Sequence, residues 1–321
     1  MEEHSMERRI VTVFGASGFL GRHLVRRLAA AGYGVRAAER DTDAALFLKP
    51  MGDVGQIVPW PADITKPDSV AAAVAGADAV VNLVGILYES GAATFRKIHE
   101  EGAANVAKAA AEAGVARLIH VSALGADANS PAKYARTKAA GEEAVKAAFP
   151  KATILRPSVV FGPEDDFFNR FASMARLSPV LPVMGGKDGP KFQPVFVGDV
   201  ADAILASLVE NKAQGQVYEL GGPAVYSFRQ IMQLVKAQTG RKRCLIPVPY
   251  WVGDMQAAVL GLLPKPPLTL DQMQLLRSDN VVGEKAKTLK HLGITPCAAE
   301  SQLPTYLMRF RNNAWQGVQN A

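Results

Sequence analysis

The sequence predicts an α/β protein in which helices flank a doubly wound parallel sheet, with a smaller mixed lobe towards the C-terminus. Three observations lead to this prediction. An apolar strand runs into three closely spaced glycines and then into an amphipathic helix, all within residues 10–28. Apolar strands then alternate with helical segments as far as about residue 160. Beyond that point the alternation becomes irregular, which indicates the second lobe.

The opening segment, Ile10–Leu28, has the strand, tight turn and helix of a Rossmann dinucleotide-binding motif. Gly15 permits the turn, Gly18 lets a pyrophosphate approach the backbone, and Gly21 lets the helix pack on the strand. The N–H groups at the start of the helix would hold the phosphates. An ordinary glycine-rich turn is the alternative. If the motif binds a dinucleotide, the other contacts expected from this turn are Ser17, Phe19, Leu20 and Arg22.

A second strand, Tyr33–Ala38, ends at Glu39 and Arg40, where the adenosine ribose would lie. A carboxylate at this place hydrogen-bonds a free 2′-hydroxyl, whereas an arginine pairs with a 2′-phosphate. Arg22 and Arg36 add positive charge nearby, so we expect NADP(H) as the cofactor. Glu39 favours the alternative, NAD(H).

A third strand, Gln56–Pro59, is followed by Asp63 and Ile64, which would lie beside the adenine ring. An aspartate at this place can accept a hydrogen bond from the adenine amino group. Asp63 could equally be the N-terminal cap of a helix at Lys66–Val74.

Two apolar strands, Ala79–Val84 and Arg117–Ser122, are typical of the buried centre of a parallel sheet. Val84 and Gly85 end the first of them on the nicotinamide side, and Ser122 ends the second. Because ligands bind beyond the carboxyl ends of such strands, both ends belong to the expected site.

Tyr134 and Lys138 are four residues apart, so they share one face of a helix that follows Ser122. A free tyrosine has a pKa of about 10, and a neighbouring ammonium favours the phenolate, which would allow proton exchange near neutral pH. The serine hydroxyl can polarise a substrate carbonyl, and the lysine can hold the nicotinamide ribose. We predict that these three residues are catalytic, or alternatively that they only contact the cofactor.

A sixth strand, Thr153–Leu155, leads into a loop whose Pro157 and Val159 would pass near the nicotinamide. We expect residues 1–160 to form the dinucleotide-binding domain, with returning segments near 190–225, and residues 161–321 to form the smaller lobe. The elements expected in these later segments are a strand at Phe192–Val197, a helix at Asp199–Leu208, a strand at Val217–Leu220, and a helix that Ser227 caps and that runs to Thr239.

The C-terminal region contains an apolar helix at 249–263, followed by prolines and then by a second helix that Thr269 caps. The apolar helix is too short to span a bilayer, so it packs in the core, lies at a membrane surface or fits a groove in a partner. Residues 236–321 hold 11 Lys/Arg and 5 Asp/Glu, which accounts for the whole net charge of +6. Such a basic tail indicates an anionic partner or an ordinary solvated surface.

Composition argues against several other classes of protein. The two cysteines are far apart and the five histidines lack metal-ligand spacing, so we expect no disulfide framework, iron–sulfur cluster or metal site. The N-terminal segment is charged, without the apolar stretch of a secretory signal, which favours a cytoplasmic and bacterial protein. Nucleic-acid binding is not expected, because the basic residues lie among apolar helices without interleaved aromatic residues.

Several motifs resemble those of the extended or atypical short-chain dehydrogenase/reductase superfamily. They are VTVFGASGFLG at 11–21, ADI at 62–64, VSALG at 121–125, YARTK at 134–138, RPSVVFGP at 156–163 and FVGDVADAI at 196–204. Segments 122–145 and 249–282 further resemble the nucleotide-binding accessory subunit of respiratory complex I (NADH:ubiquinone oxidoreductase) and its bacterial relatives.

This resemblance implies an NADP(H)-binding accessory or assembly subunit whose cofactor is structural. It further implies docking on the peripheral arm near the quinone site, at the cytoplasmic face of the inner membrane, with contact to the membrane surface open. His99 and Ala103 stand where many extended members have Asn and Thr, which disfavours a sugar-nucleotide epimerase. An NADP-dependent short-chain oxidoreductase, acting for example in quinone-related chemistry, and a redox sensor are the alternatives.

Overall fold

The computed structural model describes residues 8–311. The charged N-terminal segment 1–7 and residues 312–321 of the basic tail lie outside the described residues. The chain divides into two compact units, which are described separately. The first comprises Met1–Asn129, Arg136–Arg156 and Ala201–Tyr218, and the second comprises Ser130–Ala135, Pro157–Val200 and Glu219–Ala321.

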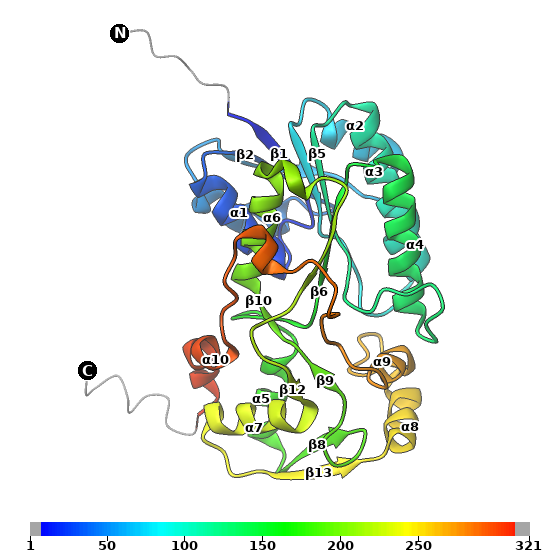
Figure 1. Cartoon of the computed structure of the whole chain (residues 1–321), viewed down its shortest axis with the longest axis vertical. Coiled ribbons are helices and arrows are strands. Elements are labelled where there is room, and N and C mark those ends of the chain that lie inside the picture. Colours follow the sequence, from blue (N-terminus) through cyan, green and yellow to red (C-terminus); the bar gives the residue numbers. More distant parts are fainter. Residues whose placement is uncertain (1–7, 312–321) are drawn as a thin grey trace, which may run out of the picture. The chain divides into compact units, whose positions relative to one another are not determined.

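The first unit is built on a seven-stranded parallel sheet (Figure 1). The chain starts at β1 in the interior of the sheet, adds β2 and β3 on one side, and then returns to add β4, β5 and β6 on the other. This reversal beside β1 is the doubly wound topology that the sequence predicts. In spatial order the strands are β11 (Val217–Leu220), β6 (Thr153–Pro157), β5 (Arg117–Val121), β4 (Ala79–Asn82), β1 (Ile10–Phe14), β2 (Gly34–Glu39) and β3 (Ile57–Pro61).

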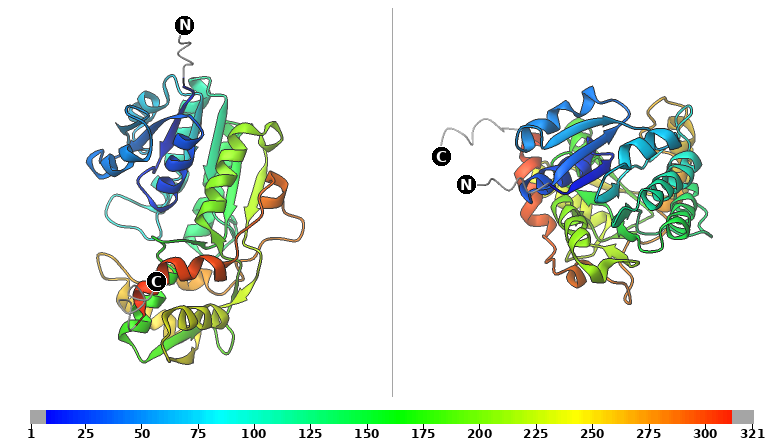
Figure 2. Two further views of the ribbon diagram at one scale, coloured as in Figure 1. Left: turned by 90° about the vertical axis from the view of Figure 1, so that its left-hand side faces the viewer. Right: turned by 90° about the horizontal axis from the view of Figure 1, so that it is seen from above.

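Helices cover both faces of this sheet (Figures 1 and 2). The helices α1 (Phe19–Ala30) and α6 (Val197–Val209) lie on one face, and α2 (Pro67–Val74), α3 (Gly102–Glu112) and α4 (Lys133–Ala148) lie on the other. The chain enters α3 through a π-helical turn, η2 (Arg96–Glu101). Such turns are rare in proteins, and those that do occur are often found at functional sites.

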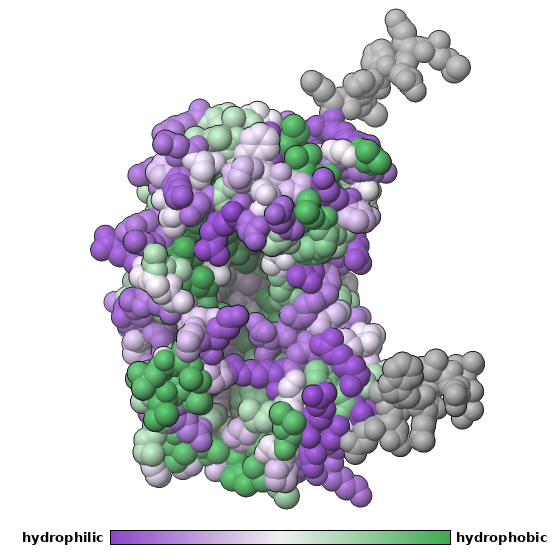
Figure 3. Space-filling model, turned by 180° about the vertical axis from the view of Figure 1, so that it is seen from behind, coloured by the Kyte–Doolittle hydropathy of each residue, from purple (hydrophilic) through white to green (hydrophobic). Residues whose placement is uncertain are grey.

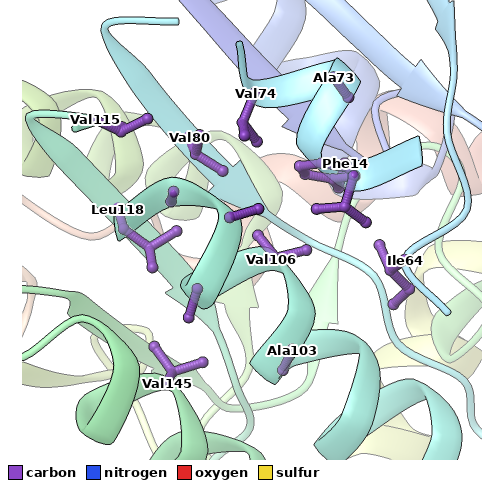
Figure 4. Close-up of a cluster of buried hydrophobic side chains, with 14 of the residues drawn as sticks. Phe14, Ile64, Ala73, Val74, Val80, Ala103, Val106, Val115, Leu118 and Val145 are labelled. Carbon is purple, nitrogen blue, oxygen red and sulfur yellow. The ribbon is translucent and has the colours of Figure 1, made fainter. Parts of the chain in front are cut away.

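One apolar cluster of the first unit lies between the sheet and the second helical layer (Figure 4). Phe14, Val80 and Leu118 project from three strands because every second residue of a strand faces the same way. They pack against apolar side chains of α2, α3 and α4, among them Val74 and Val106. Alanines dominate the inner face of α3, and these small side chains let the helix lie close to the sheet.

A buried ion pair joins α4 to β6. Both carboxylate oxygens of Glu142 accept hydrogen bonds from Arg156, at 2.8 Å from Nε and 2.6 Å from Nη2. The Glu142 side chain is only 1 % exposed. A carboxylate in this position is tolerated because the guanidinium satisfies it in two places.

The second unit contains short sheets and a helical layer. A two-stranded parallel sheet of β8 (Val180–Met184) and β13 (Cys244–Val248) is its longest strand pair. Phenylalanines from several segments, including Phe161, Phe168 and Phe228, form its core together with aliphatic side chains. Its other elements are β7 (Val160–Phe161), α5 (Phe168–Leu177), β9 (Lys191–Phe192), β10 (Val195–Phe196), β12 (Tyr226–Ser227), α7 (Phe228–Thr239), α8 (Tyr250–Leu260), α9 (Leu270–Leu275) and α10 (Ala299–Leu307).

The predicted helix caps in this unit are confirmed. Ser227 begins α7 and Thr269 begins α9, each in a capping box in which its hydroxyl accepts from the third helical residue. The single strand predicted at Phe192–Val197 is wrong. The chain forms two two-residue strands there, because Pro194 lies between them and has no N–H to give to a ladder.

The Glu142–Arg156 pair gives a stability prediction. Arg156→Met should destabilise the first unit by about 3–5 kcal/mol, because it leaves a buried carboxylate without its partner. Urea unfolding followed by circular dichroism measures this loss. Lys146→Met is the matched control, since Lys146 pairs with the exposed Glu143 and its removal should cost under about 1 kcal/mol. Equal losses in the two variants would contradict the prediction.

Candidate functional site

The candidate site lies where the strand order reverses, beyond the carboxyl ends of β1 and β4. Gly15 leaves β1 with a positive φ of 81°, which favours glycine. A Cβ on Gly21 would lie 2.2 Å from the carbonyl oxygen of Gly15, so no side chain fits there. The turn and the start of α1 are therefore in direct contact, and this contact requires glycine at residues 15 and 21, as the sequence predicts.

The first turn of α1 follows directly. Gly18 is its N-cap and supplies no side-chain hydrogen bond, and no acidic residue lies in that first turn. Phe19 and Leu20 are the first two helical residues. The backbone N–H groups of such a helix start have no partner within the helix and suit an anionic phosphate.

Glu39, at the end of β2, reaches the glycine turn. Its Oε1 accepts a hydrogen bond of 2.5 Å from the N–H of Ser17. The guanidinium of Arg22 lies at the same residue, where Nη2 donates to the carbonyl oxygen of Ser17 at 3.2 Å. Arg22 also stacks over the ring of Phe47, 5.0 Å from its centroid. A carboxylate and a guanidinium thus flank the place expected for the adenosine ribose.

The other two arginines of the NADP(H) prediction differ in position. Arg40 follows Glu39 and is exposed. Arg36 does not contribute positive charge at this place, so that part of the prediction is wrong. Its Nη1 donates to the carbonyl oxygens of Ala73 and Ala75 at the end of α2, and its guanidinium lies over Trp60. Residue 36 lies in the middle of β2, too far back to reach the carboxyl end.

Asp63 forms a turn of its own beyond β3. Its Oδ1 accepts hydrogen bonds from the N–H and the hydroxyl of Thr65, at 2.9 and 2.8 Å. Burial raises the pKa of Asp63, but these two bonds and the charges of Lys66 and Arg40 outweigh that effect and leave the pKa below its ordinary value. The alternative in which Asp63 caps α2 is wrong, because the N-cap is Lys66. Beside it, the carbonyl oxygen of Ile64 accepts from Asn105 at 2.9 Å.

On the nicotinamide side, β4 ends in Val84 and Gly85. A Cβ on Gly85 would lie 3.3 Å from Nζ of Lys138, a tight contact, and 3.7 Å from Nε2 of His99, an ordinary one. The N–H of Ile86 donates to Nε2 of His99 at 3.1 Å, which fixes that nitrogen as the unprotonated acceptor. The imidazole therefore carries its proton on Nδ1.

His99 belongs to the π-helical turn and joins it to α4. Its Nδ1 lies 3.1 Å from the hydroxyl of Thr137, and its ring stacks on Phe95. Burial and the nearby ammonium of Lys138 lower the pKa of His99 to about 3. The ring is thus a neutral, fixed connector between the end of β4 and α4.

Ser122 and Lys138 approach the same strand ends. Lys138 Nζ donates to the carbonyl oxygen of Val121 at 3.3 Å, and burial lowers the pKa of Lys138 to about 8. Ser122 Oγ and His120 Nε2 are buried, and neither has a hydrogen-bond partner among residues 8–311. Buried polar atoms of folded proteins are normally paired. These two are therefore candidates to meet a ligand or water.

Tyr134 lies one turn before Lys138 on α4, as predicted, but its chemistry differs from the prediction. Burial raises the pKa of Tyr134 to about 12, so the lowered pKa expected from the lysine is wrong for this structure. The start of α4 is held by Asp271, whose carboxylate accepts from the N–H groups of Lys133 and Tyr134 at 2.6 and 3.0 Å. A carboxylate at a helix N-terminus is stabilising because it satisfies N–H groups and complements the helix dipole.

The remaining predicted site residues, Pro157 and Val159, belong to the second unit. Pro157 is buried at the end of β6. The carbonyl oxygen of Val159 accepts from the N–H of Val195 at 3.0 Å, and its side chain packs against the apolar core of that unit.

The sequence analysis did not identify His120 and Thr137 as parts of the site, or Asp271 as the residue that holds the start of α4. His120 stands two residues before Ser122 in an otherwise apolar strand, and a polar residue in a buried strand was the available signal. Thr137 lies inside the YARTK motif. Asp271 had no local signal, because its contact with α4 spans more than a hundred positions of the chain.

No group of three or more histidine, cysteine or acidic side chains that could hold a metal ion occurs within the described range. Among the same residues, no helix combines the length and the apolar character needed to cross a bilayer.

The sheet topology and the glycine turn define a protein with a Rossmann dinucleotide-binding fold. Residues 11–221 match the NAD dependent epimerase/dehydratase family, and the chain belongs to that family.

Several relatives are similar over almost the whole chain. NADH dehydrogenase (ubiquinone) 1 alpha subcomplex subunit 9 of Arabidopsis thaliana mitochondria is 37 % identical over 314 residues, 94 % of this chain and 78 % of the relative. The mitochondrial NADH-ubiquinone oxidoreductase 40 kDa subunit of Neurospora crassa is 35 % identical over 97 % of this chain and 82 % of its own length. A ceramide reductase of Caulobacter vibrioides is 32 % identical over 91 % and 87 %. These relatives confirm the resemblance predicted from the motifs.

Solved structures share the fold at lower identity. The UDP-glucose 4-epimerase of Thermus thermophilus, in complex with NAD, superposes with a TM-score of 0.68 at 20 % identity, covering 94 % of this chain and 99 % of its own. DesIV, a dTDP-glucose 4,6-dehydratase of Streptomyces venezuelae with NAD bound, gives 0.71 at 21 % identity, covering 95 % and 98 %. At these identities the likeness shows the fold alone.

The two buried histidines predict how stability depends on pH. His99 and His120 each have a pKa lowered to about 3 by burial and by Lys138, so below pH 6.5 the unfolded chain binds protons that the folded chain does not. The free energy of unfolding should therefore fall as the pH is lowered from 6.5 to 5. The expected slope is up to about 1.4 kcal/mol per pH unit for each histidine.

Urea unfolding at several pH values measures that slope, and the pH range stays above the ordinary titration of carboxylates. His99→Gln and His120→Gln should each remove about half of the contribution that the two histidines make to this slope. The double variant should remove nearly all of that contribution. An unchanged slope in the double variant would contradict the assignment.

Proposed function

We propose that this protein is an NADP(H)-binding accessory subunit of respiratory complex I whose cofactor is a structural component. The observation that carries the proposal is the extent of the likeness to complex I subunits, which covers 94 % and 97 % of the chain in two distant relatives. The likeness therefore includes the second unit as well as the nucleotide-binding part. The proposed place is the peripheral arm near the quinone site, on the cytoplasmic face of a bacterial inner membrane.

The first unit supports the binding of a dinucleotide. The glycine turn and the start of α1 would hold the pyrophosphate, Glu39 and Arg40 the adenosine ribose, and Asp63 with Ile64 the adenine ring. Val84, Gly85, Ser122 and Lys138 lie where the nicotinamide half would go. A bound cofactor of this kind can exchange a hydride. Ser122 Oγ is buried and has no hydrogen-bond partner among the described residues, so it is proposed to hydrogen-bond the cofactor.

The protonation state of Tyr134 suits a hydrogen-bond donor to the cofactor. General acid–base catalysis is most effective when the pKa of the exchanging group lies near the working pH. Burial instead raises the pKa of Tyr134 to about 12, so its hydroxyl remains protonated at neutral pH. Tyr134 and Lys138 would then act as hydrogen-bond donors to the cofactor.

The choice of NADP(H) depends on the balance of charge at the end of β2. Arg40 is exposed and Arg22 donates to Ser17 in the glycine turn, so both lie near the place proposed for a 2′-phosphate, whereas Arg36 donates to the end of α2. The carboxylate of Glu39 opposes that phosphate and would instead accept a hydrogen bond from a free 2′-hydroxyl, as NAD(H) requires.

Substitutions at Glu39 and Arg40 should move this balance in opposite directions. Arg40→Ala should weaken NADPH binding by about tenfold or more and leave NADH binding unchanged, because it removes a charge-assisted hydrogen bond to the 2′-phosphate. Glu39→Gln should strengthen NADPH binding and weaken NADH binding. Calorimetric titration of stripped protein with each nucleotide measures both effects.

The control for these titrations is Arg26→Ala, which removes an exposed arginine of α1 outside the glycine turn. It should bind both nucleotides like the unaltered protein. Equal losses of NADH and NADPH affinity in Arg40→Ala would contradict the NADP(H) proposal.

The accessory-subunit proposal is tested by purification from membranes. A tagged chain, expressed from its own locus and extracted with a mild detergent, should co-purify with the other complex I subunits in a fixed ratio. Deletion of the gene should lower the amount of assembled complex I. Recovery of the tagged chain only as free protein, in cells that contain complex I, would contradict the proposal.

A reductase is the second candidate function, and a specific relative favours it. The Caulobacter ceramide reductase is 32 % identical over 91 % of this chain, and Ser122, Tyr134 and Lys138 are all present. Tyr134→Phe removes the exchangeable proton while keeping the ring. If this variant restores complex I as fully as the unaltered protein in the deletion strain, turnover is not needed for that role. A loss of function with nucleotide still bound would favour the reductase.

A further inference from the structure

The helix α8 has an apolar face that no described residue covers. Trp251, Met255 and Val259 recur at intervals of four residues on one side of the helix and are 64, 61 and 69 % exposed. Leu262, in the turn that follows, is 85 % exposed. Figure 3 shows the surface over α8 as a compact hydrophobic area, at the lower left of that view. Large side chains of this kind are normally buried, so the face is a candidate contact surface.

The opposite side of α8 is fixed to the second unit. A Cβ on Gly253 would lie 2.4 Å from Cε of Met273, so the helix is in direct contact with α9 there. Asp254 pairs with Arg277 at 2.5 Å, and the Tyr250 hydroxyl donates to the carbonyl oxygen of Leu276 at 2.9 Å. Because the packing fixes the inner side, the exposed apolar face is a defined feature of the folded unit.

A basic hollow lies on the same unit, just before β13. It has a volume of about 540 Å³, and its charged lining residues are Lys236, Arg241, Lys242 and Arg243. Within residues 8–311, no acidic side chain lines it. Arg241 donates a hydrogen bond from Nε to the carbonyl oxygen of Phe310, and Arg243 donates one from Nε to that of Ala175. Two of the four basic side chains are therefore held in place. The hollow therefore concentrates positive charge in a fixed place.

The strand β13 connects the hollow to α8. Its five residues span about 16 Å, and Ile246, midway along it, is 45 % exposed. Asp254 is the single acidic residue in the sequence between 236 and 265, and Arg277 neutralises it. This stretch of the second unit thus offers apolar side chains and positive charge, with no uncompensated negative charge.

We infer that α8, β13 and the basic hollow bind the surface of a bilayer that contains anionic phospholipids. The apolar face of α8 enters the boundary between headgroups and acyl chains, and the four basic residues attract lipid phosphates. The helix has 11 residues and a length of about 16 Å, against about 30 Å for the hydrocarbon core, so it lies along the surface. The inference deepens the proposed peripheral location and depends on that proposal only for its biological setting.

Charge favours a bilayer over a protein partner as the occupant. A protein that covered both the apolar face and the hollow would need acidic groups placed against all four basic side chains, whereas an anionic bilayer supplies phosphates everywhere along its surface. Each Lys or Arg near such a surface strengthens binding by about fivefold.

The test is partition of the purified full chain onto phosphatidylcholine vesicles with and without phosphatidylglycerol. The chain should bind the anionic vesicles, and high salt should weaken this binding because salt screens the charges. Lys236→Gln/Lys242→Gln should lower the partition coefficient on anionic vesicles by about tenfold or more. Trp251→Gln/Val259→Gln should lower it by a similar factor, and the tryptophan emission of the unaltered chain should shift to the blue on binding.

Matched controls remove the same charge and the same kind of side chain elsewhere. Lys285→Gln/Lys290→Gln removes two exposed lysines of the second unit that lie outside 236–265, and Val54→Gln replaces a fully exposed valine of the first unit. Both controls should partition like the unaltered chain. Circular dichroism and the temperature of unfolding establish that the surface variants are folded.

The outcomes separate this inference from the proposed function. A chain that co-purifies with complex I but binds neither kind of vesicle would overturn the inference and assign the α8 face to a protein subunit. A chain that binds anionic vesicles through these residues but never co-purifies with complex I would support the inference and overturn the proposed function. Equal binding by all variants would overturn the inference.

Discussion

The contact between the glycine turn and α1 is the constraint on which the first unit depends. The carbonyl oxygen of Gly15 lies where a Cβ of residue 21 would be, so two glycines let the helix start directly at the end of β1. This contact aims the first turn of α1 at the crevice between β1 and β4. Glu39 ends β2 and Ser122 follows β5, so both residues lie at the same edge of the parallel sheet. A side chain at residue 21 would separate the helix from the sheet, and one at residue 15 would strain the backbone, whose φ is 81°.

Much of the first unit could be predicted from the sequence because its signals are local. The strand, turn and helix of Ile10–Leu28 have a fixed spacing, and buried parallel strands read as apolar runs. Chemistry that depends on distant neighbours could not be predicted in the same way. The sequence predicts that Arg36 adds positive charge near a phosphate, but its guanidinium donates to the carbonyl oxygens at the end of α2. The pKa of Tyr134 depends on how deeply the ring is buried, which no local pattern reveals.

In the second unit, the helix caps were predictable and the packing partners were not. Ser227 and Thr269 each begin a helix in a capping box, a motif that is recognised from only four consecutive residues. The contacts of α8 and α9 come from the tertiary fold. Asp271, at the start of α9, accepts hydrogen bonds from the first turn of α4, where Tyr134 lies. The same α9 holds the inner side of α8, so within this unit one short helix supports both the apolar face and the tyrosine.

The central claim is that the crevice of the first unit holds a nicotinamide dinucleotide as a lasting part of the protein. The most direct measurement is to purify the chain without added nucleotide, denature it, and identify and quantify what is released. The account predicts close to one equivalent of NADPH that resists exchange with excess nucleotide and oxidation by carbonyl compounds before denaturation. An empty site that binds and releases nucleotide readily would contradict a structural cofactor and favour an enzyme that turns over.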